Sequence, residues 1–299
     1  LPYPDEADLG SFGPAKLLFH AARLSFRNAS GAFRCMGKLS FRPRSYQVVP
    51  LVMALKQPFT RLLVADDVGV GKTIEALMIL KELMERGDVG RFAVICLPHL
   101  CEQWQQELKD KLGIPAQIIR SSTVAKLERD LPDDRSVFHH IPYQVISIDY
   151  LKQQEKKDIF MPVCPEMVIV DEAHTCARPA GATSKNQMKR HSLMHDISQN
   201  PDRHLVMLTA TPHSGKDEEF GSLLAMLKPE FRDLDFNTID ENQRRKIAKH
   251  FIQRKRASIK RWLNQLTPFP ERSTKEIGYA LYPGYGNFYL QVLDFAQKL

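Results

Sequence analysis

The sequence predicts an α/β protein: a three-layer sandwich with a mainly parallel β-sheet, built around a phosphate-binding loop (P-loop). Three observations support this prediction. A strand–loop–helix pattern spans Arg61 to Leu77, and a second buried strand, Met167 to Val170, ends in acidic residues. Several other apolar runs of strand length are each followed by a segment of helical period. Alternation of strands and helices is typical of a parallel sheet.

The stretch from Arg61 to Leu77 reads RLLVADDVGVGKTIEAL and contains the elements of a triphosphate site. In such a loop the backbone N–H groups and the helix N-terminus point at anionic oxygens. Lys72 would reach the β- and γ-phosphates of ATP, and Thr73 would place its hydroxyl on Mg²⁺. Asp66 departs from the general pattern, because it stands where the first glycine of a P-loop would be.

The strand from Met167 to Val170 delivers Asp171 and Glu172 about 100 residues after Lys72. Ligands of parallel α/β sheets bind at the carboxyl ends of the strands, so these acids are placed to meet a bound triphosphate. Asp171 would hold Mg²⁺ through water, and Glu172 would orient or deprotonate the attacking water.

Composition and cysteine usage limit the class of protein. The 299 residues are 43% apolar and 26% charged, as in ordinary globular proteins. The longest apolar run, Val48 to Leu55, is far short of the ~20 residues that span a bilayer. The five cysteines are odd in number and include no CxxC pair, which favours reduced thiols. We expect a cytoplasmic protein, nucleoid-associated if bacterial, that does not engage a membrane.

The net charge of +7 is concentrated in two stretches. Leu9 to Ala65 and Arg244 to Arg261 each carry nine Lys/Arg and no Asp/Glu. Solvated helix faces are the common explanation of one such run. Beside a triphosphate site, a surface that follows a phosphate backbone is the better interpretation.

The chain before the P-loop offers one candidate residue. Leu1 to Leu39 contains no usable motif. Gln47, in RPRSYQ, lies 25 residues before Lys72 and precedes a helix-like apolar segment, Val48 to Leu55. A glutamine can bind the N6 and N7 edge of adenine with both its amide atoms.

Four further strands are predicted, and polar residues follow three of them. The strands are Arg91 to Leu97, Gln117 to Arg120, Gln144 to Ile148 and His204 to Leu208. The residues at their carboxyl ends include Pro98, His99, Ser147, Asp149, Thr209 and Thr211. Trp104, at helical spacing with its neighbours, is expected in the core rather than stacked on a base.

Later segments complete the expected elements. Arg178 to Asn200 reads as a polar loop near the active edge, and Lys216 to Leu227 as a helix. Glu241 to Trp262 reads as a basic helix or helix pair. The proline-rich segment from Thr267 indicates a linker, with a strand at Lys275 to Leu281 and a helix at Asn287 to Leu299 after it.

Seven motifs together resemble one family. They are RPRSYQ, DDVGVGKTIEA, PHLCEQWQQEL, ISIDYLK, VIVDEAH (a DEAH box), LTATPHSGKDEEF and FIQRKR. With them the chain from Phe41 to Leu299 resembles the first RecA-like lobe of superfamily-two ATPases of the Swi/Snf type, which translocate on double-stranded DNA. TATPHSGKDEEF followed by LLAMLKPEF resembles the bacterial branch, which includes the RNA-polymerase-recycling ATPase and motors of phage (antiviral) defence.

The resemblance assigns roles to residues of this sequence. It implies three catalytic residues, Lys72, Asp171 and Glu172, with Mg²⁺ held by Thr73 and Asp171. The ATP-binding residues would be Gln47, Asp67, Gly69, Val70, Gly71, Lys72 and Thr73. Residues coupling hydrolysis to movement would be His174, Thr209 and Thr211. Residues touching DNA would be Pro98, His99, Ser147, Asp149, Arg254 and Lys255.

The expected organisation follows from these roles. Residues 1–40 would be a flank, 41–215 the first RecA-like lobe, 216–266 a helical protrusion, and 267–299 a linker to a second lobe that is missing from this chain. Such motors carry an arginine finger in that second lobe. The predicted function is an ATP- and Mg²⁺-dependent double-stranded DNA translocase, which also fits protein partners in a larger complex. A strand-separating DNA or RNA helicase and a non-catalytic ATP-gated scaffold are the alternatives.

Overall fold

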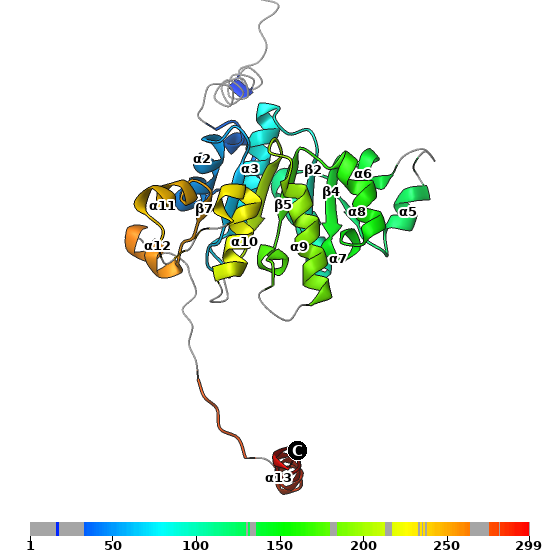
Figure 1. Ribbon diagram of the computed structural model, residues 1–299, viewed down its shortest axis with the longest axis vertical. Coiled ribbons are helices and arrows are strands. Elements are labelled where there is room, and N and C mark those ends of the chain that lie inside the picture. The colour runs from blue at the N-terminus through cyan, green and yellow to red at the C-terminus, as the bar shows by residue number, and fades with distance from the viewer. Residues whose placement is uncertain are drawn as a thin grey trace, which may run out of the picture. The chain divides into compact units, whose positions relative to one another are not determined.

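The computed structural model of the chain describes residues 16–17, 33–129, 131, 136–179, 184–212, 217–232, 234, 236, 238–263, 275–280 and 282–298 (Figure 1). The chain divides into two compact units, Leu1–Asn264 and Gln265–Leu299. The first unit contains the β-sheet and every residue predicted to bind ATP or DNA.

A seven-stranded sheet forms the centre of the first unit, and all its neighbouring strands run parallel. The strand order is β3-β4-β2-β5-β6-β1-β7. The strands are β1 (Arg61–Val64), β2 (Phe92–Cys96), β3 (Gln117–Ile119), β4 (Tyr143–Ser147), β5 (Met167–Val170), β6 (His204–Leu208) and β7 (Phe251–Ile252). The predicted mainly parallel α/β fold is confirmed.

Alternate residues of each strand face opposite sides of the sheet, and helices cover both sides (Figure 1). Leu62 and Val64 belong to the core on one side of the sheet, which also contains residues of α2 (Val49–Leu55), α3 (Lys72–Arg86) and α4 (Cys101–Leu112). Leu63 belongs to the core on the other side. That side is covered by α6 (Val137–His140), α7 (Ile148–Leu151), α8 (Gln154–Phe160), α9 (Lys185–Ser198), α10 (Asp217–Leu227) and α11 (Glu241–Ile247). Burial on both faces explains why the strands read as continuous apolar runs.

One expectation for the middle of the chain needs correction, and a second is found with an added strand. The expected polar loop at Arg178 to Asn200 contains the fourteen-residue helix α9. Its buried residues Leu193, Met194 and Ile197 anchor it to the sheet. The expected basic helix pair at Glu241 to Trp262 consists of α11 and α12 (Arg256–Leu263), separated by strand β7. Strand β7 pairs with β1, α10 packs in the core, and both lie in the first compact unit. The helical protrusion expected at 216–266 stays a prediction.

The second unit contains the helix α13 (Pro283–Gln297), close to the predicted helix at Asn287 to Leu299. Residues 275–280 have no regular secondary structure, so the strand predicted at Lys275 to Leu281 is not found in its described part. The proline-rich segment near Thr267 lies outside the described residues. Within the part of the chain that the structure describes, no helix is both long and apolar enough to cross a membrane.

Candidate functional site

The P-loop connects β1 to α3 through residues 65–71. Gly71 caps α3 with a φ of 111°, a left-handed conformation that glycine adopts without strain. Gln47 approaches this glycine closely, and its Nε2 donates a 3.0 Å hydrogen bond to the carbonyl of Val70. A Cβ at position 71 would lie 2.2 Å from that nitrogen. Gly71 therefore serves both the turn and the approach of Gln47.

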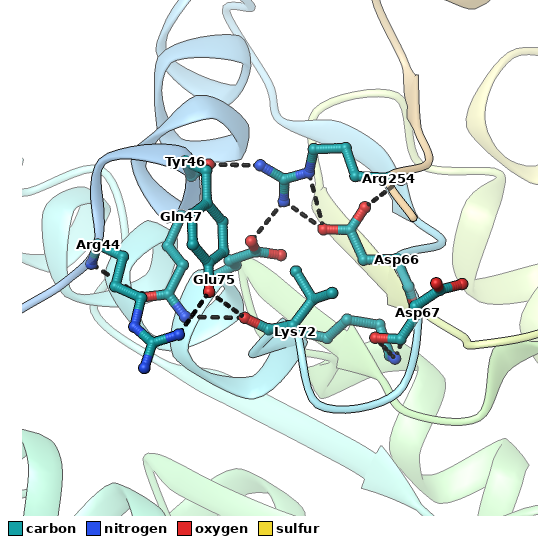
Figure 2. A network of polar contacts seen from close by, with 9 residues as sticks. Arg44, Tyr46, Gln47, Asp66, Asp67, Lys72, Glu75 and Arg254 are labelled. Carbon is teal, nitrogen blue, oxygen red and sulfur yellow. Dashed lines mark hydrogen bonds and ion pairs between the residues drawn. The ribbon is translucent and has the colours of Figure 1, made fainter. Parts of the chain in front are cut away.

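Lys72 is the first residue of α3, and its side chain folds back over the P-loop. Its Nζ donates a 2.8 Å hydrogen bond to the carbonyl of Asp66 (Figure 2). Three groups therefore lie at the start of the fifteen-residue helix α3: the ammonium of Lys72, the hydroxyl of Thr73 and the N–H groups of the helix N-terminus. This donor set fits a Mg²⁺–triphosphate group, which combines anionic oxygens with a hard cation.

Asp66, the departure from the general P-loop pattern, is fully buried and paired with Arg254 (Figure 2). Arg254 donates from its backbone nitrogen to Oδ1 of Asp66 at 2.7 Å and from Nε to Oδ2 at 2.9 Å. The same guanidinium contacts Glu75 of α3, also fully buried. Burial, and then the neighbouring Asp66 carboxylate, raise the pKa of Glu75.

The acidic residues follow β5. Asp171 accepts a 2.8 Å hydrogen bond from the indole Nε1 of Trp104 at Oδ2 and one of 2.9 Å from the backbone N–H of Glu172 at Oδ1. Burial raises the pKa of Asp171, against the effect of those donors. Glu172 has a φ of 50° and is the one non-glycine residue with positive φ among those described. Backbone strain of this kind is found preferentially at functional sites, which fits the role predicted for Glu172.

His174 connects the acids to the end of β6. Its Nδ1 lies 3.2 Å from Oε2 of Glu172 and 3.0 Å from Oγ1 of Thr209. Thr209 also accepts from the backbone N–H of Thr211 at 3.2 Å. The hydrogen bond with His174 is the main cause that lowers the pKa of Glu172, which favours its ionised form.

The two halves of the site share the carboxyl edge of the sheet. Strand β6 lies between β1 and β5, so the P-loop and Asp171 start about 10 Å apart, two strand spacings. The positive charge of Lys72 acts on the carboxylates of both Asp171 and Glu172. A triphosphate held by the P-loop can reach the acidic residues across that spacing.

The residues expected to touch DNA are distributed along the same edge with different surroundings. Pro98 and the exposed His99 form the short helix η4 (Pro98–Leu100) after β2. Ser147, at the end of β4, is buried. Asp149 forms ion pairs of 2.7 Å with Lys152 and with Arg190. Lys255 is exposed, whereas the neighbouring Arg254 is turned inward against Asp66.

Two features of this site were not anticipated from the sequence. Arg254 supports the P-loop, and Trp104 binds Asp171 although it was expected only in the core. Asp66 was the available signal for the first feature, because a carboxylate in a buried loop requires a cation. For Trp104 the sequence held no comparable signal.

The parallel sheet carries the P-loop after β1 and the two acidic residues after β5, with β6 between these strands. This arrangement defines a RecA-like P-loop protein. Residues 46–278 match the family model described as the SNF2-related domain. The chain therefore belongs to the SNF2-related family, and the predicted family resemblance is confirmed.

Two bacterial proteins illustrate the similarity to relatives. The chain is 29% identical over 190 residues to an uncharacterized ATP-dependent helicase, YqhH, of Bacillus subtilis (strain 168), a match that covers 64% of the chain and 30% of that protein. It is 26% identical to the RNA polymerase-associated protein RapA of Pseudomonas aeruginosa (strain LESB58), covering 63% of the chain and 19% of RapA. The chain thus spans less than a third of either relative.

The fold is similar to a solved structure, the Sulfolobus solfataricus SWI2/SNF2 ATPase core in complex with dsDNA. The TM-score is 0.54 at 16% identity, over 73% of this chain and 45% of that one. The structure of the Sulfolobus solfataricus SWI2/SNF2 ATPase core domain gives a TM-score of 0.52, also at 16% identity. At this identity the likeness concerns the fold.

Proposed function

We propose that the chain is the first ATP-binding lobe of an ATP-driven motor that translocates on double-stranded DNA. The observation that supports this most is the common sheet edge of the Lys72 loop and the Asp171–Glu172 pair. In this proposal the P-loop backbone and Lys72 bind the triphosphate, and Gln47 binds adenine.

Each acidic residue has a separate task in the proposal. Asp171, its carboxylate fixed by Trp104, and Thr73 would hold Mg²⁺, which when bound neutralises charge on the triphosphate. Glu172, whose Oε2 lies 3.2 Å from Nδ1 of His174, orients water and accepts its proton in this proposal. The contact between His174 and Thr209 links Glu172 to the end of β6, which allows the nucleotide state to be passed along the sheet edge.

The nucleic-acid part of the proposal is supported by charge and by position. The basic stretch Arg244 to Arg261 has no acidic residue, and its exposed Lys255 lies between Arg254 and Arg256, whose backbones both hydrogen-bond to Asp67 of the P-loop. Pro98 and His99 lie at the same sheet edge. The structural relative from Sulfolobus solfataricus was solved with dsDNA. RapA relatives are named for association with RNA polymerase, and we propose a protein partner of that kind or a phage-defence complex.

The test is ATP hydrolysis by the full-length protein with and without duplex DNA. We expect stimulation by DNA, and loss of hydrolysis by on the order of 10²-fold or more in Lys72→Ala and in Glu172→Gln. Equal rates in the parent and both variants would contradict the motor and favour the ATP-gated scaffold.

A strand-separating helicase is the second candidate, supported by the helicase name of the Bacillus subtilis relative. A strand-displacement assay distinguishes the two enzymes. A translocase consumes ATP on duplex DNA without releasing a strand, so release of a labelled strand would favour the helicase.

A further inference from the structure

The β1–β7 ladder continues beyond the sheet into the P-loop. Three backbone hydrogen bonds follow one another at every second residue. Leu63 donates to the carbonyl of His250 at 2.8 Å, Ala65 to Ile252 at 2.8 Å, and Asp67 to Arg254 at 3.1 Å. The first half of the loop is therefore held like a strand against residues 250–254, which lie near the C-terminal end of the first unit in the sequence.

The side chain of Arg254 joins three separate segments at this place (Figure 2). Its guanidinium pairs with Asp66 in the loop and with Glu75 in α3, and it donates to the carbonyl of Tyr46. Tyr46 precedes Gln47, whose amide contacts the loop carbonyl of Val70. One guanidinium thus connects the loop, the helix after it and the turn that carries the predicted adenine ligand.

Charge makes this connection specific to arginine. Asp66 and Glu75 are both fully buried, and Arg254 is the cation that the described structure pairs with them. A buried carboxylate without a partner is costly, so the loop requires a charge here. The planar fork of arginine can serve several acceptors at once, whereas the ammonium of lysine has no such fixed geometry.

We propose that Arg254 is a positioning residue for nucleotide binding, which holds the P-loop and the Gln47 turn in register through Asp66, Glu75 and Tyr46, and that it does not contact nucleic acid. The inference rests on the proposed function. It replaces the DNA contact expected for Arg254, and it leaves that role to exposed residues such as Lys255.

The test compares Arg254→Lys with Arg245→Lys in the full-length protein. Arg254→Lys retains the positive charge and removes only the fork, so we expect cooperative thermal unfolding to persist. Affinity for a fluorescent ATP analogue should fall about tenfold or more, because small displacements of binding groups are costly. Arg245, exposed and paired with Glu241 in its own helix, provides the matched change and should leave affinity within about twofold.

A DNA titration separates the two roles of Arg254. The slope of log K against log salt should be the same in Arg254→Lys and the parent, and it should remain unchanged in Arg254→Gln, since no phosphate contact is lost. Nucleotide affinity within about twofold of the parent in folded Arg254→Lys would overturn the inference. A slope lowered by about one in Arg254→Gln would also overturn it. If the parent itself bound no nucleotide, the proposed function would fail instead.

A double-mutant cycle with Asp66→Asn tests the route of the effect. If Arg254 acts through Asp66, the double variant should lose no more affinity than the weaker-binding single variant. Additive losses from the two substitutions would contradict that route.

Discussion

The indole Nε1 of Trp104 donates a hydrogen bond of 2.8 Å to Oδ2 of Asp171, 67 residues further along the chain. Trp104 is only 2% exposed and packs in the core between α4 and the sheet. The second oxygen of Asp171 accepts from the backbone N–H of Glu172. A residue of the hydrophobic core thereby fixes the orientation of the proposed metal-binding carboxylate.

Trp104→Phe should raise the Mg²⁺ concentration required for half-maximal ATP hydrolysis. Phenylalanine keeps most of the apolar packing but lacks the N–H, and loss of an outer hydrogen bond to a metal ligand typically costs about 10–100-fold in metal affinity or activity. A Mg²⁺ titration of hydrolysis measures the shift. Tyr143→Phe is the control, because Tyr143 packs against the same core but lies at the amino end of β4, away from the sheet edge that carries Asp171. An unchanged Mg²⁺ requirement in Trp104→Phe would refute this role.

Gly71→Ala should weaken nucleotide binding and lower the free energy of unfolding by about 1–3 kcal/mol. The added methyl group meets a left-handed backbone and the amide of Gln47. Urea unfolding and titration with a fluorescent ATP analogue measure the two effects. Gly90→Ala is the matched control, because a Cβ there has no neighbour within 4 Å among the described residues. The two variants should differ clearly, and equal behaviour would speak against a steric requirement for glycine at position 71.

Lys255→Glu should weaken binding to duplex DNA and flatten its salt dependence. Lys255 is exposed in a basic stretch, and each lost phosphate contact lowers the slope of log K against log salt by about 0.9. Arg256 is a poorer probe, because it donates from Nε to the carbonyl of Val68 in the P-loop at 2.6 Å. An unchanged slope in Lys255→Glu would place this lysine on a solvated face.

His204 and His250 should each lower the free energy of unfolding as the pH falls below about 6.5, whereas the raised pKa of Glu75 acts in the opposite direction across the same window. Burial lowers the pKa of His204 and of His250. In this window the two histidines bind protons more readily in the unfolded chain than in the folded chain. Their contribution to the free energy of unfolding therefore rises with pH. Each histidine contributes up to about 1.4 kcal/mol between about pH 7.5 and 5.5. Urea unfolding of the parent and of a histidine variant at the two pH values isolates the histidine contribution from that of Glu75.

His204→Asn tests that assignment. Nδ1 of His204 accepts a 3.0 Å hydrogen bond from the backbone N–H of Thr60, and the asparagine oxygen can replace it without a titrating ring. The variant should lose a clear share of the pH dependence. The same pH dependence as in the parent would exclude His204 as its source.

The sequence predicted correctly those elements that are encoded by a few consecutive residues. The apolar runs, the loop ending in Lys72 and the acids after Val170 are each contained in a few consecutive residues, and the structure has them as β1, α3 and β5. Helix α9 was missed because its charged exposed face outweighs its few buried apolar residues in the sequence pattern.

Long-range pairing explains the rest. Strand β7 has two residues inside a basic run, and only its pairing with β1 makes it a strand. Because β7 was missed, the sequence could not show that Arg254 arrives beside Asp66 from 188 residues away. The role of Trp104 depends in the same way on the neighbouring positions of α4 and β5.

The late arrival of β7 has a consequence for biosynthesis. During translation, β1 emerges early but lacks its outer neighbour until residues 251–254 have left the ribosome. Until then β1 has one side without hydrogen-bond partners, and the buried Asp66 has no counter-ion. A recombinant fragment that ends at Thr211 would keep this unpaired edge of β1 and should aggregate. A fragment extended past Leu263 contains β7 and should not.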